Sequence, residues 1–113
     1  MINTRTKGNR IRLKCMKALR QSDYLVEISE RIGNTYGQKD LFGLFDLTAI
    51  KSNIVLFIQV TCNTPHTHKK FVAFAKKYAG THLMIQQWVW MDRTGWKTFY
   101  YYNTGKYEVT KNW

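Results

Sequence analysis

The stretch DLFGLFDLTAIKSNIVLFIQVTC, residues 40–62, decides the fold. Its pattern predicts two β-strands, residues 43–50 and 53–62, joined by a tight turn at residues 51–53, where Ser and Asn bond their own backbone readily. The second strand is almost continuously apolar and rich in β-branched and aromatic residues. Such a run is typical of a central strand that is covered on both faces.

Three polar side chains interrupt these apolar strands: Asp46 in the first, and Gln59 and Thr61 in the second. Gln59 and Thr61 are two residues apart, so a strand places them on one face. A carboxylate or an amide buried in a core is costly unless it is paired or binds a metal. We therefore take these three residues as the first candidates for a functional site.

Charge points to the class of partner. The 113 residues carry 18 Lys and Arg against 7 Asp and Glu, a net charge of +11. Seven basic residues precede the first acid, Asp23: Arg5, Lys7, Arg10, Arg12, Lys14, Lys17 and Arg20. Such an excess favours a polyanion, in the first place nucleic acid, over an anionic membrane or a charge that serves solubility alone.

Composition and cysteine use indicate the class of protein. The chain is 44% hydrophobic and 15% aromatic, which fits one packed domain over residues 1–113 with a flexible basic arm at residues 1–8. Cys15 and Cys62 fall in predicted apolar elements, so we expect reduced thiols and a cytoplasmic setting, in a microbe or a virus-infected host. No apolar run approaches the ~18 residues of a membrane span, and we expect no secretion signal and no membrane partner.

The remaining elements alternate around the hairpin. Residues 9–20 predict an amphipathic helix, 24–29 a short strand, 30–42 a loop and 68–79 a second basic amphipathic helix. Residues 82–91 and 96–102 predict a further hairpin, followed by a short tail. The order α-β-β-β-α-β-β predicts an α/β (α+β) domain with one mixed β-sheet flanked by helices.

This order, with GLFD at residues 43–46 and FIQVT at residues 57–61, resembles the PD-(D/E)XK nuclease-like superfamily. The basic helices and DLFGLFD resemble its small phage-type and archaeal Holliday-junction-resolvase-like members. The resemblance covers about residues 9–100. It implies a restriction-endonuclease-like fold and a metal-dependent DNA endonuclease acting on branched or structured DNA. In this chain Gln59 stands at the second acid of the motif and Thr61 at its lysine. A relative that binds DNA without cleaving it is therefore the alternative, and a nucleic-acid-binding module of unrelated fold is a third hypothesis.

The resemblance implies a catalytic set of Asp46, Gln59 and Thr61 and a Mg²⁺ or Mn²⁺ cofactor. Candidate metal ligands are Asp46, the Gln59 side chain, the Val60 carbonyl and Asp40, with Glu27 and Glu30 as further acids. The alternative for Asp46 is a structural acid paired with a buried donor such as Gln59. Lys69 or Lys70 is a candidate to replace the missing lysine; both lysines otherwise form a solvated helix face or contact phosphate.

The candidate DNA contacts are Arg10, Lys14, Lys17, Lys69, Lys70 and Arg93. Seven aromatic residues gather in the last predicted hairpin: Trp88, Trp90, Trp96, Phe99, Tyr100, Tyr101 and Tyr102. Cross-strand packing is the first interpretation of that cluster, a self-association surface and hence a homodimer the second, and stacking on unpaired bases the third. His66 and His68 are interpreted as loop residues, with metal ligation as the alternative.

Overall fold

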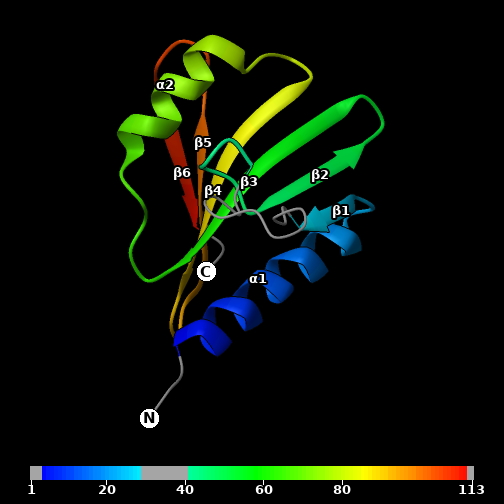
Figure 1. Cartoon of the computed structure of the whole chain (residues 1–113), viewed down its shortest axis with the longest axis vertical. Coiled ribbons are helices and arrows are strands. Elements are labelled where there is room, and N and C mark those ends of the chain that lie inside the picture. The colour runs from blue at the N-terminus through cyan, green and yellow to red at the C-terminus, as the bar shows by residue number, and fades with distance from the viewer. Residues whose placement is uncertain (1–3, 29–40, 112–113) are drawn as a thin grey trace, which may run out of the picture.

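The computed structural model of the chain describes residues 4–28 and 41–111. Its elements are α1 (Thr4–Gln21), β1 (Leu25–Ile28), β2 (Leu47–Lys51), β3 (Ile54–Cys62), α2 (His68–Tyr78), β4 (Leu83–Met91), β5 (Gly95–Tyr101) and β6 (Tyr107–Lys111). Figure 1 shows one sheet with a helix on either side. No helix in the described part of the chain is long and apolar enough to cross a membrane.

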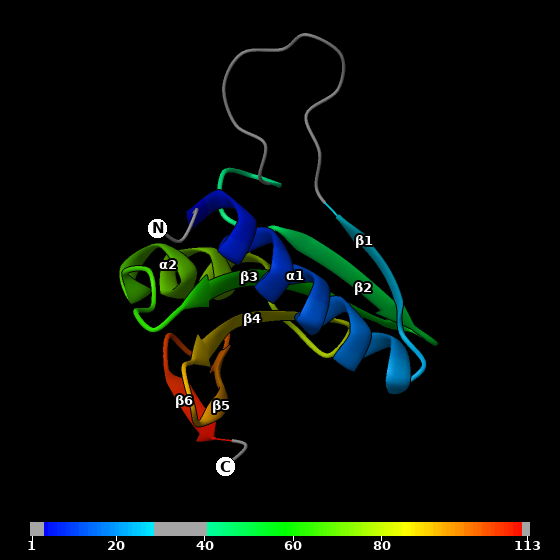
Figure 2. The same cartoon turned by 90° about the horizontal axis from the view of Figure 1, so that it is seen from below.

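The six strands form one sheet in the order β1-β2-β3-β4-β5-β6. All neighbours are antiparallel except β3 and β4, which are parallel and joined through α2. A parallel pair needs a crossover connection of this kind. The predicted α/β class and the single mixed sheet are thus confirmed, and Figure 2 shows how strongly the sheet twists from β1 to β6.

Each helix covers its own face of the sheet, so there are two cores. On the α1 face, the helix buries Ile11, Cys15 and Leu19 at the spacing of one helical stripe, against Leu47 and Ile58 of the strands. On the α2 face, the core is mainly aromatic; its buried members include Phe45, Phe71, Ile85, Phe99 and Tyr101. β3 contributes alternate residues to both faces, as the apolar run predicted for a central strand.

Most predicted boundaries differ by one residue from the observed ones, and three features differ by more. Residues 4–8, which we expected in the basic arm, form the first turns of α1, while residues 1–3 lie outside the described residues. β2 begins at Leu47 and not at residue 43, because a tight turn in which Leu41 bridges to Phe45 precedes it. The expected tail includes a sixth strand, β6, whose five residues are all exposed.

Candidate functional site

Asp46 lies where the β2–β3 pairing becomes irregular. Leu47 pairs with Ile58 in register, and the backbone N–H of Asp46 also donates to the Ile58 carbonyl, at 2.8 Å. Two successive residues thus face one, which is the arrangement of a β-bulge and redirects the local side chain. The Asp46 carboxylate then accepts a hydrogen bond from the Val60 backbone N–H at 3.0 Å. The bulge therefore fixes this carboxylate against the centre of β3.

Asp46 interacts with α1, whereas Gln59 faces α2. Burial raises the pKa of the Cys15 thiol well above its usual value, and the nearby charge of Asp46 adds to that rise. Gln59 is only 7% exposed, and it lines a pocket with residues of the first turn of α2. The structure therefore brings both residues to the same stretch of β3 but gives their side chains different surroundings.

Two buried oxygens at this stretch of β3 have no hydrogen-bond partner: Gln59 Oε1 and Thr61 Oγ1. Both side chains belong to the strand face opposite Val60, because strand residues alternate. An unpaired buried polar atom costs free energy, so such atoms are rare in proteins and point to a missing partner.

The pocket lined by Gln59 has a volume of about 230 Å³. Its wall includes Gly43 from the turn before β2, and His66, Thr67 and Lys70 from the start of α2. The structure therefore brings Lys70, one of the two lysines considered as a replacement for the missing lysine, into one pocket with Gln59. The neighbouring Lys69 is exposed to solvent.

The oxygen atoms at this stretch of β3 suit hard divalent cations, such as Mg²⁺ and Mn²⁺. In the part of the chain that the structure describes, no three His, Cys, Asp or Glu side chains gather where they would hold a metal together. Asp46 offers one carboxylate, and Gln59 and Val60 offer neutral oxygens. This chemistry fits Mg²⁺, which keeps several of its waters and binds through one or two carboxylates. Asp40 and Glu30 lie outside the described residues, and Glu27 is exposed on β1.

The six candidate DNA contacts fall into two groups. Arg10, Lys14 and Lys17 are exposed on α1 at helical spacing, and Arg93 is exposed in the turn between β4 and β5. Lys69 and Lys70 lie on α2, which covers the opposite face of the sheet (Figures 1 and 2).

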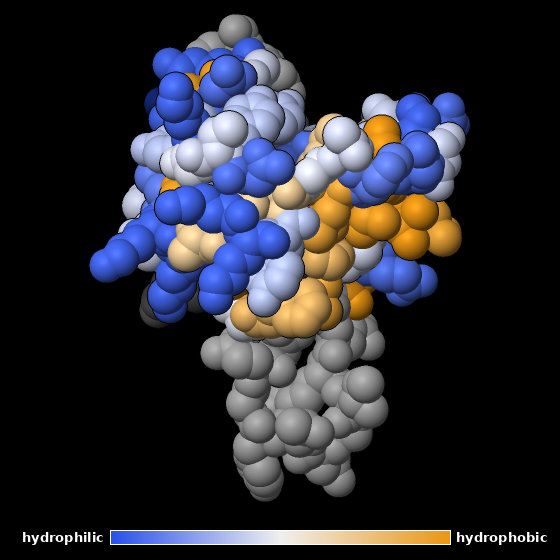
Figure 3. Space-filling view, turned by 90° about the horizontal axis from the view of Figure 1, so that it is seen from above, coloured by the Kyte–Doolittle hydropathy of each residue, from blue (hydrophilic) through white to orange (hydrophobic). Residues whose placement is uncertain are grey.

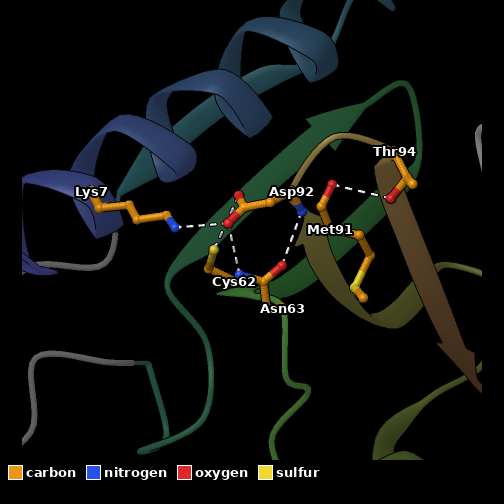
Figure 4. Close-up of polar contacts among 6 residues, drawn as sticks. All are labelled: Lys7, Cys62, Asn63, Met91, Asp92 and Thr94. Carbon is orange, nitrogen blue, oxygen red and sulfur yellow. Dashed lines mark hydrogen bonds and ion pairs between the residues drawn. The ribbon is translucent and has the colours of Figure 1, made fainter. Parts of the chain in front are cut away.

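Asp92 connects the two parts of the first group, α1 and the β4–β5 turn (Figure 4). Its carboxylate accepts from Lys7 Nζ at 3.0 Å and from Asn63 Nδ2 at 2.9 Å, and its own backbone N–H donates to Asn63 Oδ1. The hydrogen bonds from Asn63 and Lys7 lower the pKa of Asp92. The start of α1 is thereby held to the β4–β5 turn, so Arg93 lies near the basic face of α1. The sequence alone gave no sign of this contact, because Lys7 and Asp92 are 85 residues apart.

A buried polar network, of which the sequence alone gave no sign, fixes the loop before α2. Gln87 is fully buried; its Oε1 accepts from the His66 backbone N–H at 2.6 Å, and its Nε2 donates to Tyr101 Oη at 2.9 Å. His68 Nδ1 lies 2.7 Å from the same hydroxyl. Tyr101 Oη therefore links the Gln87 amide to the His68 ring, and the His68 tautomer decides whether the hydroxyl or the ring donates in the second bond. Burial raises the pKa of Tyr101 to about 12.

The aromatic cluster is explained by packing. Trp96 is 8% exposed, and the rings of Trp88 and Trp90 both meet it edge-on with centroids 5.2 Å away. Lys14 Nζ lies 4.6 Å from the Trp90 ring centroid, within cation–π range. The tryptophans therefore support the α1 core and position one of the candidate DNA contacts.

A solved structure with this architecture is that of Hjc, a Holliday junction resolvase from the archaeal hyperthermophile Archaeoglobus fulgidus. The match has a TM-score of 0.55 at 15% sequence identity and covers 94% of this chain and 84% of the resolvase chain. No protein-family model matches the sequence, and no curated protein matches it significantly. The likeness establishes the restriction-endonuclease-like fold that the resemblance implied.

Proposed function

We propose that this protein is a resolvase-type DNA endonuclease that recognises branched DNA and cleaves it with a bound Mg²⁺ or Mn²⁺. The observation that carries the proposal is the Asp46 carboxylate, fixed at a bulge of β2 against a stretch of β3 with two unpartnered buried oxygens. The fold shared with a Holliday junction resolvase supports it. The strong positive charge supplies the attraction to DNA.

Each residue has a distinct part in this proposal. Asp46 would hold the cation, with the Val60 carbonyl as a neutral ligand. The Gln59 side chain faces α2 and would lie outside the ligands of this cation. The bound cation would lower the pKa of the attacking water and stabilise charge at phosphorus. Lys70 would contact the phosphate beside the site, in place of the lysine that Thr61 does not supply. Arg10, Lys14, Lys17 and Arg93 would hold the DNA backbone.

A second candidate function, binding of branched DNA without cleavage, has its own support. Gln59 and Thr61 carry no charge, and among the described residues no three His, Cys, Asp or Glu side chains gather where they would hold a metal. With so few charged ligands, the cation would bind weakly. Wild-type protein that binds junctions but cuts no DNA with either metal would select this second function.

The testing experiment removes the charge of Asp46 and keeps its shape. Asp46→Asn should abolish cleavage of a four-way junction, since the cation loses its one charged ligand, while folding and junction binding are retained. The matched control is Asp23→Asn, in the exposed turn after α1, where a φ of 69° suits Asn. We expect Asp23→Asn to cut like wild type. Equal cleavage by the two variants would contradict the role of Asp46.

We also propose that two copies act together. Leu25 is 66% exposed and Ile50 is 43% exposed, and the two residues are cross-strand partners on the part of the α2 face that α2 does not cover. Figure 3 shows a hydrophobic patch on the side of the β2–β3 hairpin, opposite the hydrophilic surface over α2. A second copy fits this patch, because a two-fold contact pairs a surface with itself. Elsewhere the net charge of +11 keeps two copies apart.

A further inference from the structure

One stripe of α2 combines aromatic rings with positive charges. Its members, at the spacing that places side chains on one face of a helix, are Lys70, Phe74, Lys77 and Tyr78. Both lysines are exposed, and Tyr78 is 58% exposed. The core-facing side chains of the same helix are instead Phe71 and Ala75, which are buried. Core packing therefore does not explain why an aromatic ring stands between lysines on the solvated side of α2.

The turn before β2 places a further ring against this stripe. Phe42 is 66% exposed, and its ring centroid lies 5.6 Å from that of Phe74 and 5.8 Å from that of Phe57. Its φ of 54° is unfavourable for a residue with a Cβ atom. The turn is held in this shape by Leu41, whose carbonyl accepts from the backbone N–H of Phe45 at 3.0 Å. An exposed ring on a strained backbone is typical of a binding site.

These side chains line one groove of about 530 Å³. The ring centroids of Phe74 and Tyr78 are 4.8 Å apart, so Phe42, Phe74 and Tyr78 form a continuous row from the turn to the helix. Lys70 and Lys77 line the same groove and lie about 10 Å apart along the helix axis, and no carboxylate is among its described lining residues. A ligand that fits this groove must carry negative charge and flat apolar groups.

We propose that this groove binds an unpaired strand of DNA, with bases stacked on Phe42 and Tyr78 and phosphates against Lys70 and Lys77. Aromatic rings interleaved with positive side chains hold single strands in this way, because every base has a π-face. A second copy of the chain is disfavoured as the occupant, since each copy would bring its own lysines to the contact. The choice of DNA rests on the proposed function, whereas single-strand binding goes beyond it and requires neither a cation nor a branch.

The test compares two oligonucleotides that carry the same phosphates. By fluorescence anisotropy in EDTA, the wild type should bind a strand of about twelve thymidines at least about tenfold more tightly than an abasic strand of equal length. Phe42→Ala and Tyr78→Ala should each lower this preference at least about threefold, with little change in affinity for the abasic strand. Equal affinities of the wild type for the two strands would overturn the proposal.

The matched control is Tyr102→Ala. Tyr102 is 42% exposed but follows β5 and does not line the groove, so this variant should keep the full preference. Tyr78 is exposed on a helix, where Ala is well tolerated, so Tyr78→Ala decides the matter even if Phe42→Ala disturbs the turn. An unchanged preference in Tyr78→Ala, or an equal loss in Tyr102→Ala, would overturn the groove. Tighter binding of a uridine RNA strand than of the thymidine strand would overturn the choice of DNA.

The outcomes also distinguish this inference from the proposed function. A protein that prefers the thymidine strand through Phe42 and Tyr78, yet cuts no DNA, keeps the groove and loses the endonuclease. A protein that cuts junctions but binds thymidine and abasic strands equally keeps the endonuclease and loses the groove. A dimeric wild type that becomes monomeric in Phe42→Ala, measured by light scattering, would assign the groove to a contact between copies and overturn the proposal.

Discussion

Asp46 and Gln59 lie against the same strand but differ in how their polar atoms are satisfied. Asp46 accepts a backbone hydrogen bond from Val60, and its charge adds to the rise that burial causes in the pKa of the Cys15 thiol. The Gln59 amide oxygen, in contrast, lies buried without a partner. Burial without a partner costs free energy that only a ligand or a compensating function offsets. Single residues thus separate the proposed cation site at Asp46 from the pocket that Gln59 lines on the other face of the sheet.

His68 makes the stability of the fold depend on pH. Burial, and secondarily the charge of Lys97, lower the pKa of His68 below its usual value of 6.5. The unfolded chain therefore takes up a proton before the folded one does, so His68 destabilises the fold as pH falls through 6.5 toward the lower pKa of the folded state. Above this window its contribution to stability is fully present.

We expect the urea concentration at the unfolding midpoint of the wild type to decrease as the pH is lowered from about 7.5 to about 5. The decrease should be smaller in His68→Phe. The phenyl ring retains the stacking on Tyr107, whose centroid lies 4.5 Å from that of His68. This range avoids the titration of Asp92, which lies below its usual pKa of 3.8. Equal pH dependence in the two proteins would show that His68 is not responsible.

Among the elements, the β2–β3 hairpin and α2 were predictable because their apolar residues follow the strand and helix periods. β6 was not, since its five residues are all exposed and leave no alternation to detect. The early start of α1 could not be predicted, because Lys7 is held by a hydrogen bond to Asp92, which is far along the chain. In the site, Asp46, Gln59 and Thr61 could be recognised because they interrupt apolar strands. The role of Gln87 could not, because it depends on His66 and Tyr101, which come from two other segments.

The basic face of α1 is the element that we expect to hold DNA. Changing Arg10, Lys14 and Lys17 to Gln should weaken binding of all DNA sequences alike, because phosphate contacts carry no sequence information. The slope of log affinity against log salt should become shallower by about 2.7, if each side chain releases its share of counterions.

The matched control for the α1 variant changes Lys76, Lys77 and Lys106 to Gln, which alters the net charge equally. These lysines are exposed and lie at the far end of α2 and in the turn before β6. We expect this control to retain most of the salt slope. The same loss of slope in both triple variants would mean that total charge matters and that α1 has no special place.

At the scale of the whole molecule, the charge and the apolar surface are separated. The basic residues of α1 and the β4–β5 turn lie on one side of the sheet, and Leu25 and Ile50 belong to the uncovered part of the other face. This division leaves the proposed DNA face available when two copies meet through the apolar patch. A two-fold pair of DNA faces matches the paired strands of a branched junction.

The dimer is tested by molar mass in solution. Light scattering should give twice the 13.4 kDa of one chain for the wild type, and the monomer mass for Leu25→Lys, since two like charges would meet across the two-fold axis. Leu13→Lys is the control, because Leu13 is similarly exposed but lies on α1. A monomeric wild type, or equal dissociation by both variants, would contradict the proposed patch.

Recognition of branched DNA is measured by comparing the affinities of the protein for a four-way junction and for a linear duplex of the same arms, by fluorescence anisotropy in EDTA. This comparison requires no cleavage, so its outcome is informative whether the protein is an endonuclease or binds DNA without cutting it. We expect the junction to bind at least about tenfold more tightly than the duplex, equivalent to ~1.4 kcal/mol. Equal affinities, or no binding to either DNA, would contradict the recognition of branched DNA by this fold.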